Sequence, residues 1–215
     1  MFEDRKDAGQ QLARALEPYK DEGVLVLAIP KGGAEVGYEV ADHLDAEFAF
    51  LIARKLPYPN NPEAGFGAVA EDGSLYVSRR AATALPDNLI QVIIDQQREE
   101  IERRIEVLRQ GRPLPSLKER TVILVDDGIA AGSTMRAAIA LCRNQYAGKI
   151  VVAAPVSGES VARDLEEMVD EVVILEQPPF FRAVAQVYEK WYDVSDEEAI
   201  EILERWRNRH APQTS

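Results

Sequence analysis

Cysteine, histidine and long apolar runs are scarce in this chain of 215 residues. The single cysteine, Cys142, excludes an intramolecular disulfide. The only two histidines, His43 and His210, leave little material for Ser-His-Asp catalysis or histidine-ligated zinc. No apolar run approaches the ~18 residues that span a bilayer, which argues against a membrane protein. The opening MFEDRKDAGQ lacks the apolar core and basic flank of a signal peptide, so we expect a cytoplasmic protein.

Basic residues are also in the minority. The sequence holds 37 Asp and Glu against 25 Lys and Arg, which gives a net charge of −12. This charge repels phosphate backbones at long range and disfavours a general nucleic-acid-binding protein, although local basic patches remain compatible with it. Hydrophobic residues make up 46% of the chain, and its length is typical of one domain. We therefore expect a single domain over residues 1–215.

Short apolar runs alternate with helical patterns along the chain. The runs are VLVLAI (24–29), FAFLIA (48–53), TVILVD (121–126), KIVVAA (149–154) and EVVIL (171–175). Near-continuous apolar strands are buried on both faces, as in the parallel sheets of α/β proteins. Isoleucines on one stripe of residues 87–109 predict a helix, and Asp72-Gly73 within 67–78 predicts a hairpin. The pattern indicates an α/β fold: a central parallel sheet flanked by helices, with an antiparallel hairpin insertion.

The stretch VILVDDGIAAGST (122–134) combines two kinds of ligand group. A buried strand delivers Asp126 and Asp127 to the carboxyl end of the sheet, where ligands bind in open α/β folds. A helix follows, and its N-terminal amides, with the serine and threonine hydroxyls, suit a phosphate. Carboxylates beside an anion site fit a ribose 5-phosphate, whose diol donates and whose phosphate accepts hydrogen bonds. The alternative is an acidic strand end followed by an ordinary helix cap. The residues of the predicted anion loop are Ala130, Ala131, Gly132, Ser133 and Thr134.

Two further stretches carry candidate anion ligands. In AIPKGGAEVG (28–37), Lys31, Gly32 and Gly33 stand between a strand and a helix, although such a turn often has no ligand. Arg54 and Lys55 precede a stretch rich in proline and asparagine, 56–66. That composition fits a loop that stays mobile until substrate arrives, whereas the alternative for the basic pair is a solvated surface.

The stretch 122–134 resembles the phosphoribosyl pyrophosphate (PRPP) signature of the type I phosphoribosyltransferases. It differs from that signature at Ala131, where a hydroxyl residue is usual, and at Gly128, where a larger apolar residue is common. The resemblance implies a Rossmann-like phosphoribosyltransferase core over about 22–175. It also implies a small, variable hood formed by 176–215 with the N-terminal helix.

The resemblance also implies roles for the candidate residues. Asp126 and Asp127 would be catalytic, meeting the sugar hydroxyls or a metal-bound water, and 130–134 would hold the 5-phosphate. The pyrophosphate site would use Lys31, Gly32 and Gly33, in a loop that contains a non-proline cis peptide bond in this family, together with Arg54 and Lys55. Mg²⁺ would be held mainly by substrate, with no protein cage.

The expected activity is Mg²⁺-dependent transfer of the phosphoribosyl group between PRPP and a nitrogenous base, with release of pyrophosphate. The base itself is not identified by the sequence. Phe180 and Phe181 occupy the stretch that covers the base in purine members, so one of them is expected to face the base. The alternative is that both anchor the hood. A non-catalytic PRPP-binding regulator of the same fold is the alternative function, and a homodimer is left open.

Overall fold

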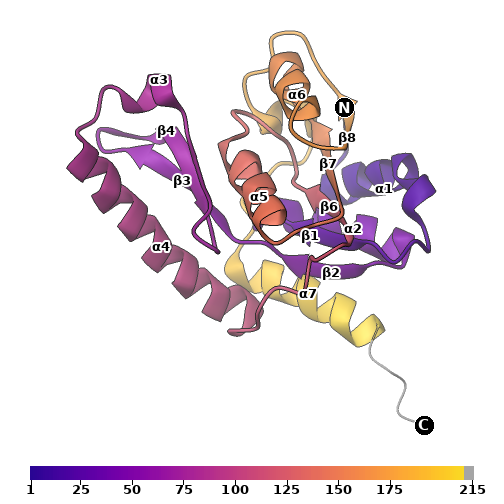
Figure 1. Ribbon diagram of the computed structural model, residues 1–215. Coiled ribbons are helices and arrows are strands. Elements are labelled where there is room, and N and C mark those ends of the chain that lie inside the picture. Colours follow the sequence, from indigo (N-terminus) through magenta and orange to yellow (C-terminus); the bar gives the residue numbers. More distant parts are fainter. Residues whose placement is uncertain (211–215) are drawn as a thin grey trace.

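A five-stranded parallel sheet forms the centre of the computed structural model, which describes residues 1–210 (Figure 1). The strand order is β2-β1-β6-β7-β8, and every pairing is parallel. The five strands predicted from the apolar runs are confirmed, because each run contains or overlaps one strand of this sheet. These strands are β1 (Leu25–Ala28), β2 (Glu47–Phe50), β6 (Thr121–Val125), β7 (Lys149–Val156) and β8 (Glu171–Glu176).

Helices cover both faces of this sheet. Alternate strand residues point to opposite faces, so Val26 packs in one buried cluster and Leu27 in the other. The first cluster includes side chains of helices α2 (Gly33–Leu44), α4 (Asp87–Arg109) and α7 (Asp196–Arg209). The second includes side chains of α5 (Ser133–Asn144). The α/β fold predicted from the sequence is therefore confirmed. The helices around the sheet are α1 (Arg5–Ala15), α2 (Gly33–Leu44), α5 (Ser133–Asn144), α6 (Glu159–Glu166) and α7 (Asp196–Arg209), with short 3-10 turns η1 (Glu17–Tyr19) and η2 (Val184–Val187).

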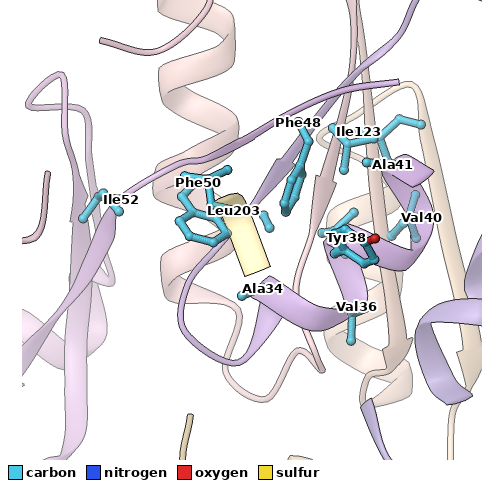
Figure 2. Close-up of a cluster of buried hydrophobic side chains, with 14 of the residues drawn as sticks. Ala34, Val36, Tyr38, Val40, Ala41, Phe48, Phe50, Ile52, Ile123 and Leu203 are labelled. Atoms are coloured by element: carbon cyan, nitrogen blue, oxygen red, sulfur yellow. The ribbon is translucent and has the colours of Figure 1, made fainter. Parts of the chain in front are cut away.

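The core between α2, β2 and α7 is shown in Figure 2. Phe48 and Phe50 from β2 lie beside Leu203 of α7 and the apolar side of α2. The ring of Phe48 also meets the ring of Trp206 edge-on, with centroids 6.2 Å apart. The start of α7 is fixed by a capping box, in which Ser195 and Glu198 satisfy each other's backbone N–H groups. This packing holds α7 alongside α2, and ion pairs of Arg205 with Glu35 and of Arg209 with Asp42 join the two helices.

A second, antiparallel sheet and a long helix stand to one side of the central sheet, at the left of Figure 1. The sheet has the order β3-β4-β5, with β3 (Ala53–Tyr58), β4 (Asn61–Ala70) and β5 (Leu75–Val77). The predicted hairpin at Asp72-Gly73 is confirmed, since it joins β4 to β5. Helix α4 (Asp87–Arg109) has the bounds predicted from the sequence, and α3 (Arg79–Ala82) precedes it.

The interpretation of 56–66 as a loop is wrong, because most of this stretch is paired in β3 and β4. The pairing is irregular, with register shifts on both sides of Pro57. Proline is found in strands at edges and bulges, and β3 is an edge strand. Leu56 and Phe66 are nevertheless fully buried, and the Tyr58 and Phe66 rings lie 5.7 Å apart. Burial of these apolar side chains outweighs the turn preference of the prolines.

A buried ion pair joins the second sheet to the end of β2. Arg109 of α4 donates to Glu71 at 2.8 and 2.9 Å and to the carbonyl of Phe50 at 2.9 Å. Glu71 also accepts from the backbone N–H of Ile52 at 2.8 Å. These bonds link the hairpin to the carboxyl edge of the parallel sheet.

None of the helices within residues 1–210 is long and apolar enough to cross a membrane. The division into a core over 22–175 and a hood stays a prediction. Residues 211–215, which that prediction placed in the hood, lie outside the described part of the chain.

Candidate active site

Asp126 and Asp127 leave the carboxyl end of β6 and diverge toward two different cavities. Asp126 is half-buried and lines the first cavity, whereas Asp127 is only 8% exposed and lines the second. The backbone N–H of Asp127 donates to Oδ1 of Asp126 at 2.8 Å, which fixes the orientation of the Asp126 carboxylate. Each cavity has a volume of about 460 Å³.

The first cavity is bounded on one side by the start of α5. Gly132 is the N-cap residue and has φ of +75°, a left-handed conformation that glycine adopts without strain. No side chain among the described residues caps this helix, so the N–H groups of its first turn are available to an anion. All five residues of the predicted anion loop, 130–134, line this cavity together with Asp126.

Arg136 of α5 supports the anion loop by a hydrogen bond to its backbone, a role that the sequence analysis missed. Its guanidinium is almost buried and donates to the carbonyl of Ala131 at 2.8 Å and to Asp164 of α6 at 3.1 Å. A Cβ atom at Gly132 would lie 2.9 Å from Nη1 of Arg136. Close approach between loop and arginine therefore also favours glycine at position 132.

The opposite wall of the first cavity comes from the β3–β4 hairpin. Lys55 lines the cavity with Glu63, Ala64 and Gly65, and its Nζ donates to the Glu63 carbonyl at 2.6 Å. Arg54 lies on the other face of β3, because neighbouring strand residues point in opposite directions. Its Nε donates to Gln97 of α4 at 3.2 Å. The structure therefore places Lys55, but not Arg54, at the cavity.

The second cavity contains the loop after β1. Lys31 and Gly32 line it, and the Pro30–Lys31 peptide bond is cis, as the family resemblance implied. A Cβ atom at Gly32 would lie 2.2 Å from Oδ2 of Asp127, so only glycine fits against that carboxylate. Gly33 begins α2 beside the backbone of Asp126. The ammonium of Lys31 lies 3.4 Å from Asp196 of α7.

Arg5 of α1 holds Asp127 from the other side of the second cavity. Its Nε donates to Oδ2 of Asp127 at 2.8 Å, and Nη1 donates to the carbonyl of Tyr192 at 2.8 Å. The guanidinium also lies over the Trp191 ring, 4.0 Å from its centroid. The hydroxyl of Tyr188 donates to the Asp127 carbonyl at 2.6 Å. Asp127 is thus a buried junction between α1, β6 and the segment 177–195.

Neighbouring charges make the electrostatics of the two carboxyls differ as well. Burial raises the pKa of Asp126 well above its usual range, and the negative charge of Asp127 raises it further. Burial raises the pKa of Asp127 too, but there the Arg5 guanidinium opposes it. A positive charge in the first cavity would therefore stabilise the ionised form of Asp126 more than that of Asp127.

The segment after β8 reaches the cavities through Val184, which the sequence analysis missed. Val184 lines both cavities, whereas neither Phe180 nor Phe181 is among the described lining residues. Phe180 is 87% exposed, and Phe181 packs against the buried cluster around Phe2. A role for either phenylalanine at the base stays a prediction.

Comparison with known proteins agrees with this fold. The sequence model of the phosphoribosyl transferase domain family matches residues 4–190, and the chain belongs to that family. A crystal structure of TT1426 from Thermus thermophilus is similar, with a TM-score of 0.80 and 37% sequence identity. The match covers 95% of this chain and 98% of that one.

Two curated proteins of Mycobacterium tuberculosis, from strains CDC 1551 / Oshkosh and H37Rv, are also similar. Both carry the name "Putative phosphoribosyl transferase" and are 38% identical to this chain over 207 residues. The match covers 95% of this chain but 47% of each relative. The chain therefore spans about half the length of the curated relatives that it matches.

Proposed function

We propose that this protein transfers the 5-phosphoribosyl group of PRPP to a nitrogenous base and releases pyrophosphate, with Mg²⁺ as the metal. One observation carries the proposal: Asp126 and the uncapped start of α5 line the same cavity of about 460 Å³. A phosphate on residues 130–134 and a sugar diol near Asp126 would use both ends of that cavity.

The proposed reaction is a displacement at C1 of the ribose. The bond between ribose C1 and the pyrophosphate oxygen breaks, and its electron pair leaves with pyrophosphate. A lone pair of the acceptor nitrogen forms the new C1–N bond, and that nitrogen loses its proton to solvent. The transition state is oxocarbenium-like, so a nearby carboxylate stabilises it. Asp126 is suited to this, because positive charge at the sugar favours the ionised form of a carboxyl whose pKa is raised by burial.

The residues present fit a magnesium ion that is held mainly by substrate. Within residues 1–210 there is no group of three or more His, Cys, Asp or Glu that could hold a metal. Mg²⁺ commonly binds one or two carboxylates together with substrate phosphates, and Asp126 is a carboxylate residue that lines the first cavity beside the anion loop. When bound, the ion would neutralise charge on the leaving pyrophosphate.

The proposed pyrophosphate ligands flank the carboxylates. Lys31 and Gly32 line the second cavity and Lys55 lines the first, so a pyrophosphate held by both lysines would lie where the cavities adjoin. Lys31 would exchange its contact with Asp196 for the phosphate. The position of Arg54 against α4 gives it no part in this arrangement.

Pyrophosphate release tests the proposal. The assay uses PRPP, Mg²⁺ and a panel of nucleobases, with wild-type protein, Asp126→Asn and, as a matched control, Asp95→Asn on the exposed side of α4. We expect turnover with at least one base, its loss in Asp126→Asn and its retention in Asp95→Asn. Binding of Mg-PRPP without turnover of any base would instead identify a PRPP-binding regulator. Absence of PRPP binding would refute both functions.

A further inference from the structure

Val184 stands at the boundary between the two cavities. It lines the first cavity with the anion loop and the second with Arg5, Lys31 and Trp191. Its side chain lies over Gly128, the first residue after the acidic pair. A Cβ atom at Gly128 would lie 2.5 and 2.8 Å from the two methyl groups of Val184. The valine therefore occupies the space that a side chain at position 128 would fill.

Space, rather than backbone conformation, explains the glycine at position 128. Gly128 is absent from the positive-φ glycines of the described chain, so another residue could adopt its backbone conformation. A Cβ there would also lie 2.8 Å from Val156 of β7. The next residue, Ile129, donates its N–H to the Val156 carbonyl at 2.8 Å, which holds this turn against β7. Gly128 and Val184 thus fit closely against each other.

The segment that carries Val184 is itself anchored. At the other end of η2, Val187 is 4% exposed and its carbonyl accepts from the N–H of Phe2 at 2.7 Å. The Tyr188 hydroxyl bonds to the backbone of Asp127. The wall between the cavities is therefore built from two fixed elements, the turn after β6 and η2.

We propose that Val184 is a specificity-determining residue that sets the size of the acceptor where the two cavities meet. This inference rests on the proposed function, which places the phosphoribosyl group in the first cavity. The acceptor then shares the second cavity with the pyrophosphate, which Lys31 and Gly32 hold. The wall that remains offers a flat nitrogen heterocycle the indole of Trp191 and the carboxylate of Asp193. Its reacting nitrogen reaches ribose C1 past the methyl groups of Val184.

The test compares Val184→Ala with Val187→Ala. Both changes remove the same atoms from the same short element, but Val187 is in the buried cluster and is not among the residues that line the cavities. Binding of monocyclic and bicyclic nucleobases is measured by calorimetry with Mg²⁺ and ribose 5-phosphate, which has no leaving group and cannot react. The kcat/KM values with PRPP are measured on the same panel, together with Tm.

We expect Val184→Ala to shift the ratio of bicyclic to monocyclic affinity at least tenfold toward the bicyclic bases. Val187→Ala should lower Tm and leave the ratio within twofold. Val184→Ile, which enlarges the side chain, should shift the ratio toward the monocyclic bases. If Val184→Ala does not fold, the result for Val184→Ile tests the inference.

The outcomes separate this inference from the proposed function. An unchanged ratio in folded Val184 variants, or an equal shift in Val187→Ala, overturns the inference even if the enzyme turns over. A shifted binding ratio without turnover of any base refutes the proposed reaction and leaves Val184 as the residue that selects the heterocycle. Absence of binding by every base to every variant overturns the assignment of the second cavity.

Discussion

Replacing Asp126 or Asp127 by asparagine should have a different consequence at each position. The sequence alone predicts that Asp126→Asn and Asp127→Asn both fold normally and both lose PRPP affinity. The structure separates them, because Asp126 faces the cavity of the anion loop while Asp127 is paired with Arg5. We expect Asp126→Asn to lose ligand affinity and Asp127→Asn to lose stability.

The magnitudes follow from what each carboxylate contacts. A hydrogen bond to a charged group is worth ~1.5–3 kcal/mol, so Asp126→Asn should weaken Mg-PRPP binding by about 10- to 150-fold. Its stability should not fall, since Asn retains an oxygen for the N–H of Asp127 and carries no charge that burial penalises. The side chains of Arg5 and Asp127 are only 4% and 11% exposed. Removing one charge of such a pair costs ~3–5 kcal/mol, and Asn keeps one acceptor, so we expect about 3 kcal/mol. That corresponds to a fall in Tm of about 6–12 °C.

Calorimetric titration with Mg-PRPP and thermal unfolding of the same preparations measure both quantities. Asp95→Asn on the exposed side of α4 serves as the control for loss of one carboxylate charge. The reasoning fails if Asp127→Asn keeps the wild-type Tm and loses as much PRPP affinity as Asp126→Asn. It also fails if Asp126→Asn binds Mg-PRPP like the wild type.

Two further predictions follow from the same geometry. Thr134→Ala should weaken binding of ribose 5-phosphate more than that of Mg-pyrophosphate, and Lys31→Ala should do the reverse, because these residues line different cavities. Calorimetry with each ligand checks this, and equal losses of both ligands in both variants would contradict the division. The pKa of Asp126 is raised in the folded state, so its ionisation makes the free energy of unfolding fall as pH rises from about 4 through the folded pKa. Denaturant unfolding should show a smaller fall for Asp126→Asn than for the wild type, and identical slopes in the two proteins would refute the assignment.

The central sheet could be predicted because its inner strands β1, β6 and β7 are buried on both faces, which requires nearly continuous apolar runs in their sequences. KIVVAA has few polar residues, and the structure extends this run to Val156 as β7. The hairpin was predictable for a local reason too. Gly73 adopts φ of +87°, and the carboxylate of Asp72 accepts from the Ser74 N–H at 2.8 Å, so both turn residues act within the turn itself.

The stretch 56–66 was not predictable from local signals, because its conformation depends on distant apolar partners. Its prolines favour a turn, but Leu56 and Phe66 belong to the same buried cluster as Ile94 and Ile101 of α4. Tertiary burial therefore overrides local preference here. The alternation of side chains along a strand would have indicated that Arg54 and Lys55 cannot both face one ligand, had the stretch been recognised as a strand.

In the candidate site too, residues close together in the sequence were predictable, whereas contacts between residues far apart in the sequence were not. The acidic pair and the anion loop lie within thirteen consecutive residues, 122–134, and their juxtaposition follows from the strand and helix that carry them. Arg5 lies 122 positions before its partner Asp127, and nothing in MFEDRKD indicates that this arginine is buried. Gly128 was visible as a departure from the family pattern, but its partner Val184 was not.

The N-terminal segment explains how these distant residues are brought together. Phe2 exchanges backbone hydrogen bonds with the end of η2 and the segment that follows, donating to Val187 and accepting from the N–H of Glu189 at 2.9 Å. Arg5 starts α1 within this arrangement and reaches Asp127 and the carbonyl of Tyr192. The first five residues therefore connect the wall that carries Val184 to the acidic pair at the end of β6. Because the same residues also fix Asp127, the shape of the second cavity and the position of its carboxylate depend on one set of contacts.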